Sequence, residues 1–317
     1  MKLQLTKKQK QFIEAREDEV LYGGAAGGGK SYGQVVDSFL YALRYAGSRQ
    51  LVLRRTFPEL KRSLILTSLI VFDKDVAKYN SSDHIWILQN GSVVEFGYCE
   101  RDADVQKYQS AEYDVIRFDE LTHFTEFQYT YLISRVRGVN DFPKQIKSST
   151  NPGSEGHAWV KSRFIENKEP NKVYKDDYDR TTVFIPAKVQ ENTFLMEADP
   201  LYVQRLEQLP ENERRALLDG DWDVFEGQVF KEFRKHKHIV EPFQIPSTWR
   251  RFCSIDWGYN DPCCVLWYTV GPDRRIYVYR ETYLNQRRAS EVAQDNIRLS
   301  EGEKIDYCVS SPDMWQR

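Results

Sequence analysis

Apolar and polar residues alternate along the first half of the chain in a pattern that predicts strands separated by helices. Short apolar runs predict strands at 19–24, 50–55, 113–120 and 144–150, and segments with helical spacing follow at 32–45, 57–72 and 125–138. A hairpin is expected at 85–98, where Asn90-Gly91 marks a tight turn. Alternation of strands and helices predicts a mostly parallel sheet in an α/β domain.

The pattern changes twice further along the chain. Short helices and turns fill the segment from about 187 to 248, which indicates a small linker subdomain. A strand-rich pattern then predicts strands near 252–257, 263–270, 275–284 and 305–310, with a helix at 287–300. We therefore expect three parts, residues 1–188, 189–248 and 249–317.

Composition limits the function only weakly. The 317 residues include 45 Lys+Arg and 47 Asp+Glu, and a net charge of −2 does not by itself indicate nucleic acid. Five cysteines without metal-type spacing are typical of reduced thiols in a cytosolic protein: Cys99, Cys253, Cys263, Cys264 and Cys308. The chain shows no signal peptide and no apolar run of transmembrane length, so we expect no membrane partner.

A glycine-rich segment, GGAAGGGKS, joins the first predicted strand to the first predicted helix. It fits the phosphate-loop pattern G-x-x-x-x-G-K-[ST], and a plain glycine turn would not require the flanking strand and helix. In such a loop, backbone N–H groups surround the phosphates, the lysine reaches the β- and γ-phosphates, and the hydroxyl holds Mg²⁺. The candidate nucleotide-binding residues are Gly24, Ala25, Ala26, Gly27, Gly28, Gly29, Lys30 and Ser31.

Two acids end the predicted strand VIRFDE, at the carboxyl edge of the sheet. We expect Asp119 to face Mg²⁺ through water and Glu120 to polarise the attacking water. A solvated helix start is the alternative for a lone Asp-Glu pair, because acids favour the first turn of a helix. Their position after a phosphate loop favours the catalytic interpretation.

Three further segments belong to the same candidate site. Gln9 or Gln11 could read the adenine edge, and a charged amphipathic helix is the alternative there. Ser149, Thr150 and Asn151 end the fourth strand, where they are expected beside the γ-phosphate and able to sense its loss; a strand-ending turn is the alternative. The basic segment 54–62 could grip DNA phosphates, reach a neighbouring subunit's nucleotide, or be a solvated face.

In this order, the motifs resemble those of the large terminase subunit of tailed bacteriophages, an ATP-driven DNA-packaging motor. The resemblance rests on the adenine glutamine, the phosphate loop, Asp119-Glu120 and the Ser149-Thr150-Asn151 coupling motif. It continues through the segment ending in Leu-Asp-Gly-Asp-Trp and covers essentially the whole chain. It implies a RecA-like, additional-strand P-loop ATPase, a linker subdomain and the start of a ribonuclease H-like nuclease.

The resemblance also implies partners and a place of action. The expected cofactors are ATP and Mg²⁺, and the expected partners are double-stranded DNA, the portal or prohead and the small terminase subunit. A ring of identical subunits when working, a monomer in isolation and the host cell cytoplasm fit the same family. Many members carry Arg inside the phosphate loop, where this chain has Ala25 and Ala26. An arginine finger would therefore come from elsewhere, with Arg101 or segment 54–62 as candidates.

The nuclease part of the resemblance rests on two carboxylates. Asp256 ends the strand SID, and Asp313 follows the last predicted strand; ribonuclease H-like nucleases use acids at such positions to bind two Mg²⁺ or Mn²⁺ ions. The family has a further carboxylate downstream, whereas this sequence ends at Arg317. We therefore expect the 317-residue chain to hydrolyse ATP and not to cleave DNA.

Two other functions fit part of the pattern. Another P-loop DNA helicase or translocase would share both nucleotide motifs, but it would need a second RecA-like half in place of the acidic strand ends after residue 250. A nucleotide-gated scaffold without turnover would not need Glu120.

Overall fold

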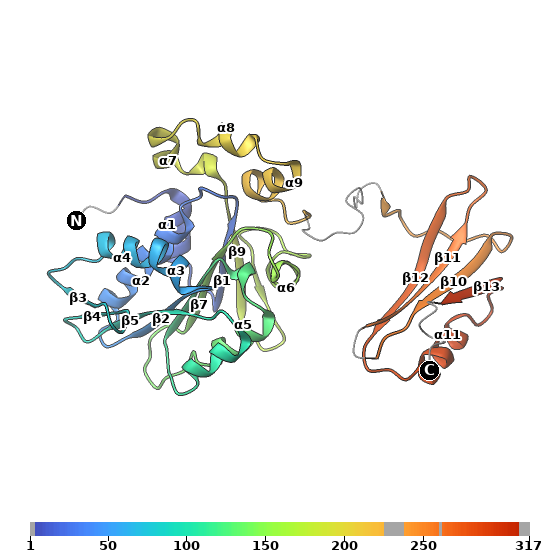
Figure 1. The fold of residues 1–317 in the computed structure, drawn as a ribbon, viewed down its shortest axis with the longest axis horizontal. Coiled ribbons are helices and arrows are strands. Elements are labelled where there is room, and N and C mark those ends of the chain that lie inside the picture. Colours follow the sequence, from blue (N-terminus) through green and yellow to red (C-terminus); the bar gives the residue numbers. More distant parts are fainter. Residues whose placement is uncertain (1–3, 225–237, 260–261, 311–317) are drawn as a thin grey trace. The chain divides into compact units, whose positions relative to one another are not determined.

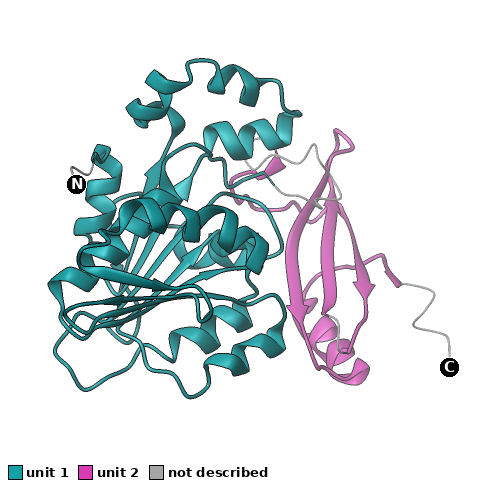
Figure 2. Ribbon diagram, turned by 60° about the vertical axis from the view of Figure 1, so that its left-hand side comes forward, with its two compact units in different colours: residues 1–229 teal, residues 230–317 magenta. Residues whose placement is uncertain are grey.

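The computed structural model describes residues 4–224, 238–259 and 262–310. The chain divides into two compact units, residues 1–229 and 230–317 (Figure 2). The segment expected to form the linker subdomain begins inside the first unit, and its outer boundaries remain a prediction.

The first unit is built on a mostly parallel sheet with the strand order β3-β4-β5-β2-β6-β7-β1-β9-β8 (Figure 1). The four predicted strands and the hairpin are confirmed. Strand β7 lies between β1 and β6 and pairs in parallel with both, so it is the additional strand that the expected fold requires. The strands are β1 (Glu19–Gly24), β2 (Arg49–Arg54), β3 (Ala77–Asn80), β4 (Ile85–Leu88), β5 (Val93–Tyr98), β6 (Val115–Asp119), β7 (Gln145–Thr150), β8 (Val173–Lys175) and β9 (Thr181–Ala187).

Helices cover both faces of this sheet because successive strand residues point to opposite sides. Val52 and Val94 pack against α1, α2 and the 57–72 segment on one face, whereas Leu51 and Phe118 pack against α5 and α6 on the other. The 57–72 segment is helical as predicted, with one π-helical turn inside it. The helices are α1 (Lys7–Glu14), α2 (Lys30–Arg44), α3 (Phe57–Leu60), η1 (Lys61–Ile65), α4 (Leu66–Val71), α5 (Glu126–Ile133) and α6 (His157–Phe164).

Short helices after β9 form a layer over one end of the sheet (Figure 1). Val189, Leu206 and Leu218 are their buried core, and Ala26 of the glycine-rich loop packs against them. This layer contains η4 (Val189–Glu191), α7 (Thr193–Ala198), α8 (Tyr202–Glu207), α9 (Glu211–Arg214) and η5 (Arg215–Asp219). The sequence thus predicted short helices here, but the pattern alone did not indicate that they contact the loop.

The second unit contains a mixed sheet with the order β12-β11-β10-β13. Strand β10 is antiparallel to β11 and parallel to β13, and a helix connects β12 to β13. The expected start of a ribonuclease H-like nuclease remains a prediction for this unit. The elements are β10 (Arg250–Asp256), β11 (Cys263–Val270), β12 (Ile276–Leu284), α11 (Ala289–Leu299) and β13 (Tyr307–Ser310).

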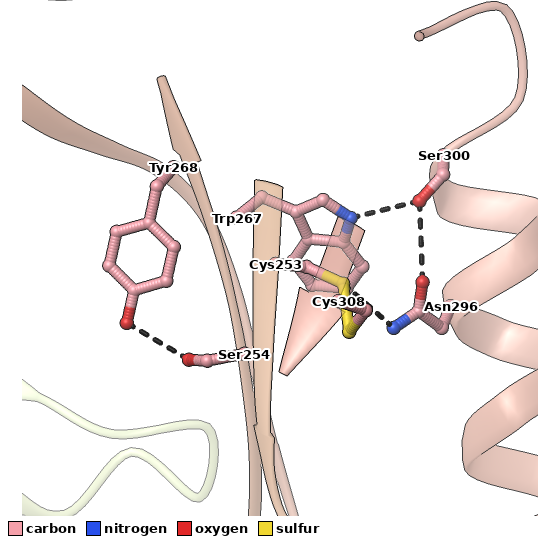
Figure 3. Close-up of a disulfide and its surroundings, with 7 residues drawn as sticks. All are labelled: Cys253, Ser254, Trp267, Tyr268, Asn296, Ser300 and Cys308. Atoms are coloured by element: carbon pink, nitrogen blue, oxygen red, sulfur yellow. Dashed lines mark hydrogen bonds between the residues drawn. A yellow bond between two sulfur atoms is a disulfide. The ribbon is translucent and has the colours of Figure 1, made fainter. Parts of the chain in front are cut away.

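A disulfide joins the two parallel strands of this unit, between Cys253 and Cys308 (Figure 3). The residues are register partners with a Cα–Cα distance of 4.5 Å, which lies within the range for disulfides. The expectation that all cysteines are reduced is therefore wrong for this pair. Sequence spacing could not reveal it, because the two cysteines are 55 residues apart and meet only through the strand order.

Within the described residues, none of the helices combines the length and hydropathy that a membrane span requires.

Candidate active site

The carboxyl ends of the parallel strands β1, β2, β6 and β7 bring the predicted motifs to one edge of the sheet. The phosphate loop follows β1, where Gly24, Gly27 and Gly29 have φ values of 124°, 72° and 74°. These values lie in the region that L side chains rarely adopt, so the glycines allow the loop to turn. Gly29 is also the N-cap of α2, and the loop therefore ends at a helix N-terminus, where backbone N–H groups favour an anion.

Lys30 lies at the centre of this edge. Its ammonium donates hydrogen bonds to the Ala25 carbonyl oxygen at 2.5 Å and to Asn151 Oδ1 at 2.7 Å. Burial lowers the pKa of Lys30, while the negative charges of Glu120 and Asp119 oppose that shift. Its position beside a glycine-rich loop is the one that the lysine of a phosphate loop occupies.

Asp119 joins strands β6 and β7 to the phosphate loop. Its carboxylate accepts hydrogen bonds from Ser31 Oγ at 3.0 and 3.1 Å and from Ser149 Oγ at 2.7 Å. The residue is 1% exposed, and carboxylate and hydroxyl oxygens are the hard ligands that Mg²⁺ prefers. The donor set formed by Ser31 and Asp119 therefore fits a magnesium ion that also keeps several waters.

Glu120 has an unusual backbone conformation. Its φ of 57° and ψ of 61° are left-handed, although it is not a glycine. A non-glycine residue in this region costs energy, and such residues are enriched at active sites. Burial raises the pKa of Glu120, and the neighbouring charge of Asp119 raises it further.

The coupling motif splits between two faces of its strand. Ser149 and Asn151 point to the phosphate-loop face. The amide oxygen of Asn151 accepts a hydrogen bond from Lys30, and its Nδ2 donates to the carboxylate of Glu120 at 3.3 Å. Thr150 points to the other face, where its hydroxyl accepts a hydrogen bond from the Thr122 N–H at 3.1 Å. The sequence placed all three side chains beside the γ-phosphate, but the alternation of a strand separates Thr150 from the other two.

The two candidate adenine-reading glutamines occupy different environments. Gln9 is 3% exposed and donates a hydrogen bond to the Gly29 carbonyl oxygen at 2.8 Å. Gln11 instead donates to Asn171 at 2.9 Å and lies apart from the loop. A cavity of about 360 Å³ adjoins the loop beside Gln9, and it is lined by Gln4, Gln9, Gly29, Tyr32, Asn192, Phe194 and Leu195.

The layer of short helices contacts the phosphate loop directly, a contact that the sequence pattern does not predict. Asn192 donates a hydrogen bond to the Gly27 carbonyl oxygen at 2.7 Å, and the Ala26 N–H donates to the Leu217 carbonyl oxygen at 2.7 Å. A Cβ on Gly220 would lie 2.8 Å from the Gly24 backbone, so only glycine fits there. In the sequence, the only indication of this contact is the glycine within the Leu-Asp-Gly-Asp-Trp segment.

The arginine candidates also separate. Arg54 turns into the site of its own chain, with Nη1 2.6 Å from Asp119 Oδ2. Arg101 is exposed at the start of a 3-10 turn (Asp102–Tyr108) and has no contact with the phosphate loop among the described residues.

In the second unit, the structure describes one of the two carboxylates predicted for a nuclease site. Asp256 is the last residue of β10, at the predicted strand end, and it is exposed. Asp313 lies outside the described residues. Across the described ranges, no group of three or more His, Cys, Asp or Glu residues is arranged to hold a metal ion.

Comparisons with known proteins agree with this architecture. Residues 16–220 match the family described as phage terminase large subunit. The large terminase of a thermophilic bacteriophage is similar in structure, with a TM-score of 0.59 and 15% identity over 98% of this chain and 78% of that chain. Its complexes with ADP and with ATP-gamma-S give TM-scores of 0.58 and 0.56, at 15% and 16% identity and the same coverage. No curated protein matches the chain.

Proposed function

The chain belongs to the phage terminase large subunit family, and from this premise we propose that it is an ATP-driven motor that moves double-stranded DNA into a prohead. The observation that carries the proposal is the meeting of Lys30, Ser31, Asp119, Glu120 and Asn151 at one edge of the sheet. The similar terminase of the thermophilic bacteriophage was solved with ADP and with ATP-gamma-S, which supports nucleotide binding at the corresponding fold.

In the proposed reaction, each side chain has a separate role. Lys30 neutralises the β- and γ-phosphates, and Ser31 and Asp119 would hold Mg²⁺, which supplies positive charge to the phosphates when bound. Glu120 orients the attacking water and accepts its proton. Its raised pKa makes it a stronger base than an exposed carboxylate.

Asn151 is proposed to report hydrolysis. Its amide bridges Lys30 and Glu120, so a change at the phosphates alters contacts at the end of β7. Thr150 would pass this change to the segment after Glu120 through Thr122. These contacts join the end of β7 to the residues that directly follow β6, which is a short path for coupling.

The base of the nucleotide is proposed to occupy the cavity beside Gln9. This residue already contacts the loop through Gly29, whereas Gln11 does not. Tyr32 and Phe194 add aromatic surface on which a purine can stack. We therefore favour Gln9 over Gln11 as the adenine-reading residue.

The wider assignments are proposals of the same kind. We propose an ATPase domain over 1–188, a linker subdomain over 189–248 and a nuclease domain beginning at 249, in which Asp256 and Asp313 hold Mg²⁺ or Mn²⁺. The motor is proposed to work in the host cytoplasm as a ring with the portal and the small subunit. The helicase alternative loses support, because the mixed sheet of the second unit is not a second parallel RecA-like half.

The test is nucleotide binding and turnover in the purified chain. We expect Mg²⁺-dependent ATP hydrolysis, and we expect Lys30→Ala to weaken ATP binding strongly because the ammonium is lost from the loop. Lys74→Ala, at an exposed lysine with no proposed role, is the matched control. Unchanged affinity for ATP in Lys30→Ala would contradict the phosphate-loop assignment.

A further inference from the structure

Arg54 is the member of the basic segment 54–62 that enters the nucleotide site of its own chain. It is the last residue of β2, and β2 pairs with β6 so that Leu53 lies opposite Phe118. The next positions along the two strands are Arg54 and Asp119, whose Nη1 and Oδ2 atoms are 2.6 Å apart. The side chain of Arg54 is 16% exposed. The ion pair is therefore part of the sheet edge and not a surface contact.

The guanidinium of Arg54 uses only some of its donors. Nη1 donates to Asp119 and to Ser63 Oγ at 3.0 Å. Nε is buried and has no hydrogen-bond partner among the described residues, and the carboxylate of Glu59 is 3.9 Å away. A guanidinium has five N–H donors in a planar fork that suits carboxylate and phosphate oxygens. Arg54 can thus bind another oxyanion with donors that the fold leaves unused.

The carboxylate of Asp119 is the partner of Arg54 and also the group that would bind a divalent cation. Asp119 receives the hydroxyls of Ser31 and Ser149 as well as Arg54. A divalent cation held by Ser31 and Asp119 would repel the guanidinium from this oxygen, because two positive charges would share one buried carboxylate. The phosphate loop has Ala25 and Ala26 and offers no arginine of its own. The γ-phosphate of ATP is then an oxyanion at this edge available to the released side chain.

We infer that Arg54 is a cis-acting γ-phosphate sensor, which pairs with Asp119 when the site lacks nucleotide and transfers to the γ-phosphate when a divalent cation takes Asp119. The inference rests on the proposed ATPase function. It also separates Arg54 from the DNA-gripping and neighbour-reaching roles considered for the basic segment. No covalent step is involved, only the exchange of one ion pair for another.

The test compares ADP and ATPγS binding by titration calorimetry at several Mg²⁺ concentrations. Arg54→Ala should lose about 10- to 100-fold of the wild-type preference for ATPγS over ADP, the usual range for a hydrogen bond to a charged group. It should also need less Mg²⁺ for half-maximal ADP binding, because no internal cation competes for Asp119. Arg44→Ala, an exposed arginine at the other end of α2, should behave as wild type.

Arg54→Gln is the control for loss of side-chain packing, because it keeps a polar side chain near Asp119 but removes the charge. It should follow Arg54→Ala in both measurements. If both variants keep the wild-type ATPγS preference and Mg²⁺ requirement, or if both lose ADP binding entirely, Arg54 is not a sensor. Failure of the wild-type chain to bind either nucleotide would instead overturn the proposed function, and with it this inference.

Discussion

Two clusters of charged side chains share strands β6 and β7 but differ in their surroundings. The inner cluster contains Asp37, Arg117 and Lys147, whose side chains are 6%, 0% and 1% exposed. The edge cluster lies two residues further along each strand, where Asp119 and Ser149 meet Ser31 and Arg54. Residues two apart on a strand point the same way, so both clusters lie on the α2 face of the sheet.

The two clusters differ in the hydrogen-bond acceptors that surround their cationic side chains. In the inner cluster, Arg117 also donates to Gln50 at 3.0 and 3.1 Å, and Lys147 also donates to the carbonyl oxygens of Phe12 and Ile13 at 3.0 and 3.3 Å. In the edge cluster, Arg54 has a buried Nε without a hydrogen-bond partner among the described residues. Charged side chains therefore stabilise the fold where other protein groups accept their hydrogen bonds. Where a donor has no protein acceptor, it remains available for a ligand.

The largest expected effect is on catalysis at the edge cluster. Glu120→Gln keeps the shape of the side chain but cannot accept a proton, so kcat for ATP hydrolysis should fall about 10²- to 10⁴-fold. Nucleotide affinity and thermal stability should change little. Steady-state ATPase assays and thermal melts measure this, with the exposed Glu112→Gln as the control. Turnover at the wild-type rate would remove Glu120 from its proposed role.

The inner cluster should respond in the opposite way, through stability. Asp37→Asn leaves the buried cations Arg117 and Lys147 without their shared carboxylate. Breaking a buried ion pair in this way typically costs about 3–5 kcal/mol in the free energy of unfolding. Urea unfolding followed by circular dichroism measures the loss, and the exposed Asp83→Asn should be nearly neutral. A loss below about 1 kcal/mol would mean that the cluster contributes little to the fold.

This contrast also shows which parts of the molecule the sequence could predict. The phosphate loop and Asp119-Glu120 were recognisable because each is a local motif attached to one strand. Arg54 and the cysteine pair were not, because their contacts depend on which strands are neighbours. The orientation of Thr150 required the exact strand register.

Some elements were also missed for local reasons. Strand β9 was not predicted, although it pairs with β1 and completes the sheet beside the phosphate-loop strand. Its sequence TTVFIPA has β-branched residues but also a proline, which is unusual inside a sheet. Helix α6 contains His157 and Lys161 among its buried positions, so its apolar pattern was weak.

A smaller effect of the inner cluster should depend on pH. Burial lowers the pKa of Lys147 to about 8 from its ordinary value of 10.5, although Asp37 partly opposes the shift. Between these two values the unfolded chain binds more protons at this site, so the Lys147 contribution to stability rises with pH, by up to about 1.4 kcal/mol per pH unit. Below pH 8 the lysine is charged in both states and its cost is constant.

Lys147→Met isolates this contribution. Subtracting its stability from that of the wild type at each pH cancels the tyrosines, whose raised pKa values act in the opposite direction above pH 10. We expect the wild type to gain on the variant as pH rises from 8 to about 10, measured by urea unfolding. A difference that does not change over this range would show that Lys147 titrates normally.

The smallest expected effect concerns Thr150, which lies on the same strand as both clusters but on the opposite face. Its hydroxyl accepts a hydrogen bond from the Thr122 N–H and contacts the Thr122 hydroxyl at 2.8 Å, and the residue is fully buried. Thr150→Val keeps the branched shape and removes these contacts, which should lower the free energy of unfolding by about 1 kcal/mol. Because the side chain points away from the phosphate loop, ATPγS affinity should stay within about twofold of wild type.

Ser149→Ala supplies the matched comparison for Thr150→Val, since its hydroxyl donates to Asp119 on the ligand face. That change should alter the Mg²⁺ requirement for nucleotide binding, whereas Thr150→Val should not. In a packaging assay with prohead and DNA, Thr150→Val should move less DNA per ATP hydrolysed, because the path from β7 to the segment after Glu120 is weakened. Equal effects of both changes on Mg²⁺-dependent binding would show that the two faces of β7 are not functionally separate. Unaltered packaging in Thr150→Val would place the coupling path elsewhere, with Asn151 and its contact to Glu120 as the remaining connection.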